Sequence, residues 1–367
     1  MTDFTILRTG AAAAALSVAL VGVAGAQERV VNVYNWSDYI DESVLEDFTK
    51  ETGIKVVYDV FDSNEIVETK LLAGGSGYDV VVPSGPFLAR QITAGVFQKL
   101  DKSKLTNLEH MWPDVTERLG KYDPGNEYAV NYMWGTTGIG VNVDKVEAIM
   151  PDAPIDSVEL IFNPEIASKF QECGIHLLDA ADELIPAALN YMGRDPDSKD
   201  PEDIQAAGEL LKTIAPYVQK FHSSEYINAL ANGDICVAFG WSGDIIQAQA
   251  RAEEAGNGVN VEYNIPKEGA YMWFDNMAIP SDAQNVEEAH EFINFMMRPE
   301  VIAKASNYVA FANGNLSSQE LLDPEVLENP AIYPPPEVTA KLFSVTPYDN
   351  RVQRVLTRTW TGVKTGT

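Results

Sequence analysis

Positively charged, metal-binding and redox-active residues are scarce in this 367-residue chain. It has two cysteines and four histidines, with neither an H-E-x-x-H nor a C-x-x-C motif, so we expect no metal and no cofactor. Lysine and arginine number 26 against 54 acidic residues, which gives a net charge of −28. This negative charge argues against binding to nucleic acid or to anionic membranes, and it favours encounter with cations.

The amino-terminal segment lacks the features of a lipoprotein or a membrane anchor. Residues 11–23 are small and apolar, follow a single arginine, Arg8, and are too few for a comfortable membrane span. Ala24-Gly25-Ala26 fits an A-x-A cleavage site, with no cysteine there for lipid attachment and no arginine pair for the twin-arginine route. We therefore expect residues 1–26 to be a cleavable signal peptide, with an uncleaved anchor as the alternative.

Both cysteines, Cys173 and Cys236, lie in the mature part of the chain. An even number of cysteines in an exported protein suggests one disulfide. A catalytic role for either thiol is not favoured, because no histidine neighbours them in sequence.

What the chain does contain is an alternation of strand and helix patterns. Apolar, β-branched runs at residues 30–34, 55–61 and 78–82 are each followed by a helical pattern. Such alternation is typical of parallel sheets covered by helices, so the expected fold class is α/β. Ligands of open α/β sheets bind at the carboxyl ends of the strands, where a site should be sought.

Aromatic and acidic residues recur together at these strand ends. Asn35-Trp36-Ser37-Asp38-Tyr39 follows the strand at 30–34, and Trp241-Ser242-Gly243-Asp244 follows another apolar strand at 234–240. A third group is Trp273-Phe274-Asp275. An aromatic box closed by carboxylates suits a slender organic dication, because aromatic faces bury methylene groups and attract ammonium groups.

Simpler explanations exist for each of these features. Asp244 alone is typical of a helix N-cap. Gly240–Asp244 lies where a serine hydrolase would carry its nucleophile, Ser242, but that motif needs glycine in place of Asp244 and a suitable histidine downstream, and only His290 follows. The glycine-rich segment 135–142 lacks the helix and acid of a dinucleotide site, so a crossover between two lobes is favoured. The basic residues of 351–364 could pair internally, and we assign them no binding role.

In this order, the motifs resemble those of the bacterial periplasmic putrescine- and spermidine-receptor family. The similarity covers essentially the whole mature chain. It rests on Trp36-Ser37-Asp38-Tyr39, Val82-Pro83-Ser84, Tyr132–Gly140, Phe221–Asn228, Leu230–Cys236 and Ile332-Tyr333-Pro334-Pro335.

The resemblance implies a type II periplasmic binding fold, in which two α/β lobes with parallel-rich sheets are joined by crossover strands and hold a ligand in the cleft. We expect residues 27–134 with 262–310 to form lobe 1 and residues 135–261 with 311–367 to form lobe 2. The family's members are receptors and not enzymes. We also expect the protein to be periplasmic and monomeric. It would deliver polyamines to the membrane permease subunits of an ABC transporter.

The resemblance also implies roles for individual residues. Trp36 and Trp241 would sandwich the methylene chain with Tyr39 nearby, Asp244 and Asp275 would take one ammonium group, and Ser37, Asp38, Ser84 and Glu183 would serve the other end. Cys173 and Cys236 match the family's disulfide positions.

Two departures bear on which amine is preferred. Trp273 stands where putrescine receptors tend to have phenylalanine, and is seen in spermidine-preferring relatives. Phe311 replaces a tyrosine, whereas Ser84 matches the putrescine type. The expected ligand is therefore putrescine, spermidine or both, with Trp273 favouring spermidine slightly. The alternatives are a receptor of the same fold for another small cationic solute, a receptor that signals occupancy to a sensor protein, and a secreted hydrolase around Ser242.

Overall fold

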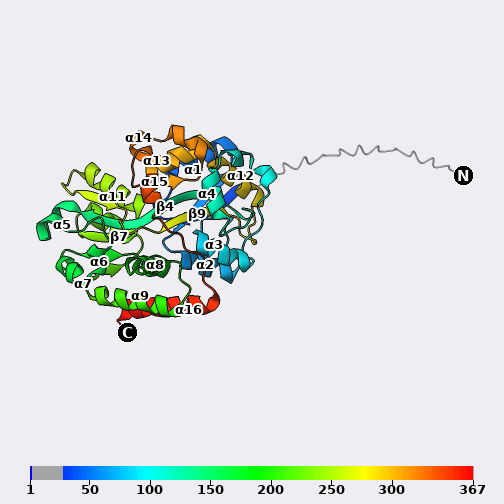
Figure 1. The fold of residues 1–367 in the computed structure, drawn as a ribbon. Coiled ribbons are helices and arrows are strands. Elements are labelled where there is room, and N and C mark those ends of the chain that lie inside the picture. Colours follow the sequence, from blue (N-terminus) through cyan, green and yellow to red (C-terminus); the bar gives the residue numbers. More distant parts are fainter. Residues whose placement is uncertain (2–27, 367) are drawn as a thin grey trace.

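Two α/β bodies lie side by side in the structure, a computed structural model that describes Met1 and residues 28–366 (Figure 1). The predicted signal peptide, apart from Met1, lies outside the described residues. Among those residues, no helix combines the length and apolar character that crossing a bilayer requires.

The strands are β1 (Val30–Trp36), β2 (Lys55–Phe61), β3 (Val80–Val81), β4 (Ala129–Asn142), β5 (Ile175–Leu177), β6 (Lys220–Phe221), β7 (Val237–Trp241), β8 (Val261–Asn264), β9 (Met272–Ala278) and β10 (Ala312–Asn313). The α-helices are α1 (Glu42–Thr52), α2 (Asn64–Ala73), α3 (Gly85–Thr93), α4 (Pro113–Leu119), α5 (Val143–Ile149), α6 (Glu159–Phe162), α7 (Pro164–Ala167), α8 (Ala181–Tyr191), α9 (Pro201–Ile214), α10 (Glu225–Ala231), α11 (Ser242–Ala255), α12 (Val286–Met296), α13 (Pro299–Val309), α14 (Pro324–Leu327), α15 (Pro336–Thr339) and α16 (Asn350–Thr365).

A single long strand, β4, connects the sheets of the two bodies. The strand order is β2-β1-β3-β9-β4-β7-β5-β6, with β8 and β10 also paired to β4. β1 runs parallel to β2 and β3, and β5 runs parallel to β6 and β7. Residues 129–136 of β4 pair with β9, whereas residues 137–142 pair with β7 and β8. The α/β class and the crossover at 135–142 are therefore confirmed.

Glycines let other groups approach β4 closely at this crossover. A Cβ atom on Gly138 would lie 2.5 Å from the backbone oxygen of Asn264, and one on Gly135 would lie 2.6 Å from the indole of Trp273. Both distances are shorter than a side chain tolerates, so the small residues are explained by packing and not by phosphate binding.

The hydrophobic residues form separate clusters in the two bodies, of which the first contains β1, β2, β3 and β9 and the second contains β5, β6 and β7. One includes Val33, Phe48 and Ile293 around β1, α1 and α12, and another includes Phe239 and Leu356 around β7 and α16. A smaller cluster of Trp134, Phe274 and Ile332 packs beside β4 and β9. The division of the chain into the two discontinuous lobes given above stays a prediction.

The predicted disulfide between Cys173 and Cys236 is confirmed, with Cα atoms 5.5 Å apart and a sequence separation of 63 residues. It ties the turn before β5 to the residue before β7, so it lies inside the second body. Cys236 is fully buried.

Replacing both Cys173 and Cys236 by serine should lower the free energy of unfolding by about 4 kcal/mol, because the unfolded chain regains the conformational entropy that closing a loop of this length removes. Urea unfolding of the double variant, compared with the oxidised parent, measures this loss. Equal midpoints with equal slopes would contradict the prediction.

Candidate functional site

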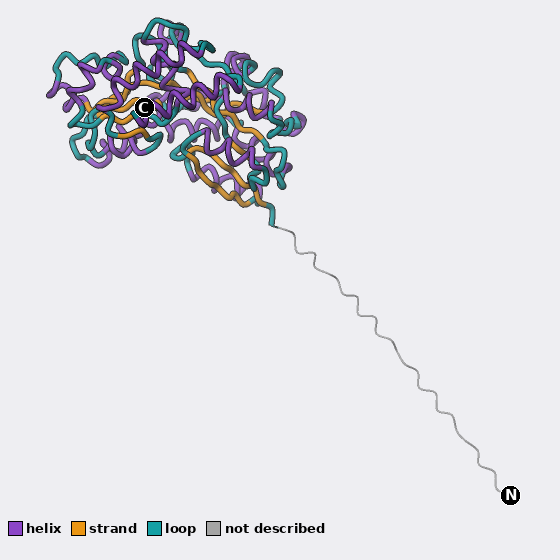
Figure 2. The backbone as a smooth tube through the Cα atoms, turned by 90° about the horizontal axis from the view of Figure 1, so that it is seen from below, coloured by secondary structure: helices purple, strands orange, loops and turns teal. Residues whose placement is uncertain are grey.

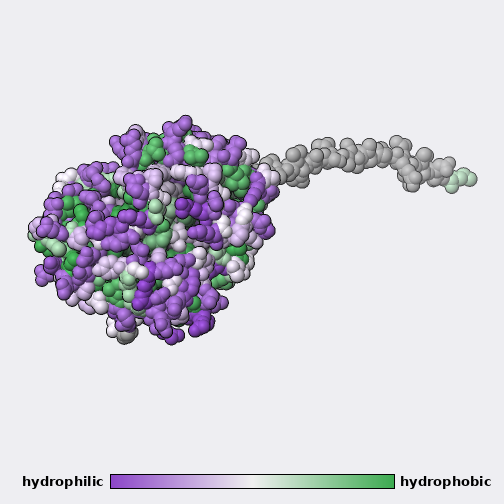
Figure 3. All heavy atoms as spheres, viewed as in Figure 1, coloured by the Kyte–Doolittle hydropathy of each residue, from purple (hydrophilic) through white to green (hydrophobic). Residues whose placement is uncertain are grey.

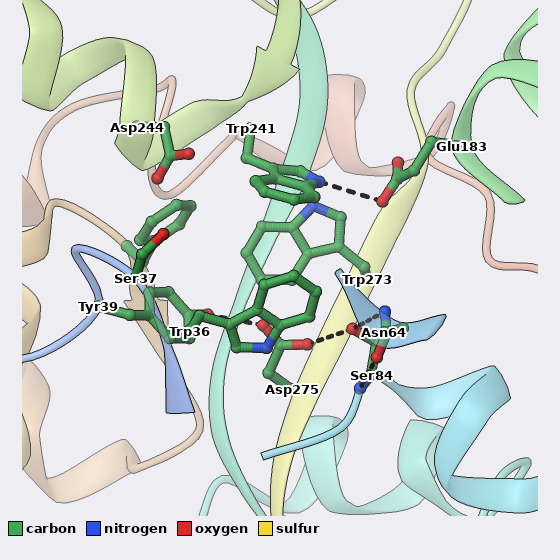
Figure 4. Close-up of a pocket in the computed structure, with 11 residues that line it drawn as sticks. Trp36, Ser37, Tyr39, Asn64, Ser84, Glu183, Trp241, Asp244, Trp273 and Asp275 are labelled. Carbon is green, nitrogen blue, oxygen red and sulfur yellow. Dashed lines mark hydrogen bonds between the residues drawn. The ribbon is translucent and has the colours of Figure 1, made fainter. Parts of the chain in front are cut away.

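A cavity of about 30 Å³ lies between the two bodies, where the ends of β1 and β7 meet the middle of β9, so Trp273 and Asp275 lie within a strand and not at its end as expected (Figure 4). Its wall is formed by Trp36, Ser37, Tyr39, Asn64, Ser84, Glu183, Trp241, Asp244, Trp273, Asp275 and Phe311. The structure thus brings together every residue that the sequence analysis placed in a site except Asp38, and it adds Asn64. The volume suffices for about two water molecules, so the walls nearly meet.

Aromatic rings from both bodies meet at the centre of this cavity. The ring centroids of Trp36, from β1, and Trp241, from β7, are 5.4 Å apart, with an angle of 74° between the ring planes. Phe311 lies 5.4 Å from Trp273 and 5.1 Å from Tyr39, again edge to face. The two tryptophans touch instead of standing parallel, so a methylene chain sandwiched between them stays a prediction for a bound state.

Asp275, on β9, accepts hydrogen bonds from two hydroxyl groups. Ser84 donates to one carboxylate oxygen over 2.6 Å, and Tyr39 donates to the other over 3.0 Å. Burial raises the pKa of Asp275 to about 7, although both hydrogen bonds oppose the shift. Ser84 therefore belongs with Asp275, and its assignment to the opposite end of a ligand is corrected.

Asp244 lies in the first turn of α11 without capping it. The helix begins after Trp241, which makes no side-chain cap, and the carboxylate of Asp244 instead accepts a 2.6 Å hydrogen bond from Tyr226. The interpretation of Asp244 as an N-cap is therefore wrong. Burial raises the pKa of this carboxyl to about 7, with the hydrogen bond from Tyr226 opposing the shift.

Glu183, on α8, supplies the third buried acid. Thr137 donates to one of its oxygens over 2.5 Å, and the Trp241 indole donates to the other over 3.1 Å. Burial, followed by the adjacent Asp182, raises the pKa of Glu183 to about 8. Figure 4 shows Glu183 and Asp244 on opposite sides of Trp241, with Asp275 below the rings. The negative groups thus surround the aromatic centre on several sides.

Asp38 does not line the cavity but connects the two bodies beside it. Its carboxylate forms a 2.6 Å ion pair with Arg251 of α11, and Gln247 donates to its backbone oxygen over 3.3 Å. Asp38 also has a positive φ of 53°, which turns the loop after β1 towards α11. Because Arg251 occupies its carboxylate, direct contact of Asp38 with a ligand is not supported by this geometry.

Two functional candidates escaped the sequence analysis, Asn64 and Tyr226. Asn64 exchanges hydrogen bonds with Ser84 over 3.0 and 3.1 Å, so it orients the partner of Asp275. It comes soon after the end of β2, and the strand-end rule that singled out Trp36 could have found it. Tyr226 lies on α10, far from any strand end, and only the packing of α10 on α11 reveals its contact with Asp244.

The site offers little support for hydrolysis or for a metal. Ser242 is buried, and its hydroxyl lies 3.5 Å from the backbone nitrogen of Thr136. His290, its candidate base, instead bonds Val286 and Asp101 in the first body. Within residues 28–366, no group of three or more histidine, cysteine or acidic side chains is arranged to hold a metal ion.

Comparison with known proteins places the chain among solute receptors. Residues 43–334 match the family model of bacterial extracellular solute-binding proteins. The chain is 55% identical to the putrescine-binding periplasmic protein SpuD of Pseudomonas aeruginosa strain UCBPP-PA14, over 96% of this chain and 97% of that protein. It is 52% identical to the putrescine-binding periplasmic protein PotF of Escherichia coli strain K12, over 98% and 97%. A solved structure, a putative spermidine/putrescine ABC transporter from Listeria monocytogenes, superposes with a TM-score of 0.82 at 34% identity, over 92% of this chain and 100% of that one.

Proposed function

The chain belongs to the bacterial extracellular solute-binding protein family, and we propose that it is a periplasmic receptor that captures a polyamine between its two bodies and delivers it to the permease subunits of an ABC transporter. It is not an enzyme. The fold is the two-lobed type II arrangement of periplasmic binding proteins. A cleavable signal peptide over residues 1–26 would direct it to the periplasm.

One observation carries this function: three buried carboxyl groups and five aromatic rings line the cavity, and no lysine or arginine does. An anionic solute would need a basic partner and would meet Asp244, Asp275 and Glu183 instead. The lining suits a slender dication that separates the walls on binding, because its methylene groups contribute about 0.8 kcal/mol each when buried against the rings. Each ammonium group gains from a carboxylate and from the ring faces.

Closure follows from the way the wall is divided. Trp36 and Asp275 come from β1 and β9 of the first body and Ser84 from the residue before α3, whereas Trp241 and Asp244 come from β7 and α11 of the second. A ligand that contacts both sets is bound more tightly by the closed arrangement than by an open one, so it shifts the population towards closure.

Calorimetry with putrescine and butylamine tests the proposal, because the two share a four-carbon chain and differ by one amino group. We expect putrescine to bind and butylamine to bind far more weakly, since one end of the monoamine leaves a buried acid unpaired. Spermidine is titrated in parallel, and glutamate serves as an acidic control. No heat with either polyamine, or equal affinity for butylamine and putrescine, would overturn the proposal.

The chain-length preference depends on Trp273, which fills the cavity wall beside Gly135. Its indole nitrogen is buried without a hydrogen-bond partner among the described residues, whereas those of Trp36 and Trp241 are bonded. Phenylalanine would remove this unpaired donor and also part of the ring surface against which the additional methylene groups of a longer amine could pack.

Trp273→Phe should shift the ratio of putrescine to spermidine affinity towards putrescine by about fivefold, ~1 kcal/mol, close to the value of one buried methylene group. Titration of both amines into the variant measures the ratio. Trp360→Phe, a buried tryptophan of α16 outside the cavity, is the control and should leave it unchanged. An unchanged ratio in both variants would remove the basis for a preference at Trp273.

A further inference from the structure

The carboxyl-terminal helix α16 carries a basic face in a strongly acidic protein. Its sixteen residues include Arg351, Arg354, Arg358 and Lys364 and no aspartate or glutamate, whereas the whole chain has a net charge of −28. The three arginines are spaced by three and four residues, which places them on one side of the helix. They are exposed, and the buried side chains of Val352, Leu356 and Trp360 lie on the opposite side.

None of the three arginines forms a side-chain hydrogen bond or an ion pair among the described residues although, besides the hydrogen bonds from backbone nitrogens, the charges of Arg351 and Arg354 lower the pKa of Asp349. Lys364 pairs with Asp179 over 2.7 Å, as expected for a basic residue that pairs internally. Among residues 28–366, no carboxylate forms an ion pair with Arg351, Arg354 or Arg358. The nearest acid in sequence, Asp349, already accepts hydrogen bonds from two backbone nitrogens at the start of the helix. We call the face formed by Arg351, Arg354 and Arg358 the arginine face.

The helix lies where the two bodies meet. It packs along α9 of the second body, and Gln353 accepts a 3.2 Å hydrogen bond from Arg90 on α3 of the first. A cavity of about 280 Å³ separates α2 and α3 from α8 and α16 at this seam. Figure 1 shows α16 along the lower edge of the molecule, where Figure 3 shows strongly hydrophilic side chains, and Figure 2 views this edge from below, with the carboxyl terminus on the near side.

We propose that the arginine face docks onto an acidic periplasmic surface of the transporter's membrane subunits. This inference rests on the proposed function. Charge complementarity selects that partner, because guanidinium groups that form no internal ion pair can pair with carboxylates of the partner, while the negative remainder of the receptor is repelled by the same surface. This difference in charge between α16 and the rest of the receptor orients the approaching receptor with α16 towards the transporter.

The position of α16 also makes docking sensitive to closure. The Arg90–Gln353 contact fixes the helix relative to the first body only when the two bodies are together. A partner that contacts both the arginine face and α3 therefore finds the two surfaces in matching positions on the closed receptor. When the bodies separate, the two surfaces move apart and the partner can no longer contact both.

The test compares two variants that each remove three positive charges. One is Arg351→Gln/Arg354→Gln/Arg358→Gln. The control is Lys55→Gln/Arg118→Gln/Lys121→Gln, which changes three exposed residues of the first body that form no ion pair among the described residues. Putrescine uptake and ATP hydrolysis are measured in proteoliposomes containing the transporter, as functions of the concentration of putrescine-loaded receptor.

The arginine-face variant should need at least about tenfold more receptor for half-maximal stimulation, and the control should match the parent. The parent's half-maximal concentration should rise between 50 and 300 mM salt, and that of the arginine-face variant should change less. Stimulation by the variant at the parent's concentration overturns the inference. The inference is also overturned if the parent binds phosphatidylglycerol vesicles that contain no transporter and the arginine-face variant does not. The partner would then be the lipid surface. Calorimetry with putrescine on all three proteins separates this result from failure of the receptor function, since the variants should bind the amine as the parent does.

Discussion

Asp275→Asn is expected to weaken polyamine binding by about 2–5 kcal/mol, or about 30-fold to 4,000-fold in Kd, because it leaves an ammonium group in a closed cavity without its carboxylate. The loss should arise from charge alone. The amide oxygen of asparagine can still accept the hydrogen bond from Ser84, and the amide nitrogen can donate to the Tyr39 hydroxyl, so the local geometry is kept.

Calorimetry with putrescine measures this loss, with Asp123→Asn as the matched control. Asp123 is also buried, but it accepts hydrogen bonds from the backbone of residues 128 and 129 and does not line the cavity. The control should therefore lose stability and keep its affinity. Asp275→Asn should keep its stability and lose affinity for putrescine. Stability is kept because burial disfavours the ionised form of Asp275, so replacing it by a neutral amide costs the folded protein little. Affinity close to that of the parent in Asp275→Asn would refute the role of this carboxylate.

The parts of the site that sequence could reveal are those that topology fixes. Trp36, Ser84 and Trp241 follow strands that run in the same direction within their bodies, and parallel strands bring their carboxyl ends to one edge. Local patterns therefore located most of the wall. The resemblance to a known family supplied Phe311, which no local pattern distinguishes, and gave Glu183 its expected role.

The parts of the site that the sequence analysis missed depend on which of several possible partners each side chain contacts in the folded protein. Asp38 stands within the motif of Trp36, yet Arg251, more than two hundred residues away, takes its carboxylate. Ser84 was assigned away from Asp275, although β3 pairs antiparallel with β9 and an isolated bridge beyond the end of β3 joins Ser84 to Asp275. Tyr226 approaches Asp244 only through packing of α10 on α11. None of these outcomes is contained in spacing or propensity.

The pH dependence of binding follows from the same buried acids. The pKa values of Asp244 and Asp275 are raised to about 7 and that of Glu183 to about 8, in each case chiefly by burial. A bound ammonium group favours the ionised carboxylate, so binding near neutral pH must release protons. We expect affinity for putrescine to rise from pH 6 to pH 8, by up to about tenfold per pH unit for each carboxyl group that loses its proton on binding.

Calorimetry at pH 6 and pH 8, each in two buffers with different heats of ionisation, gives both the affinity and the number of protons released. Asp275→Asn should release fewer protons than the parent, and Asp123→Asn should release the same number. A Kd that does not change between pH 6 and pH 8, with heats independent of the buffer, would show that the acids are already ionised before the amine arrives.

The stability of the ligand-free protein should change with pH in the opposite direction. Between the ordinary pKa of a carboxyl group, about 4, and the raised values of 7 to 8, the folded protein holds protons at these sites that the unfolded chain has released. The contribution of these acids to stability is therefore greatest at the acidic end and falls as pH rises through this window. Thermal unfolding from pH 5 to pH 8 should show the decline without putrescine, and saturating putrescine should reduce or reverse it. The two trends share one cause, since the proton that stabilises the closed cavity at low pH is the one that the ammonium group replaces.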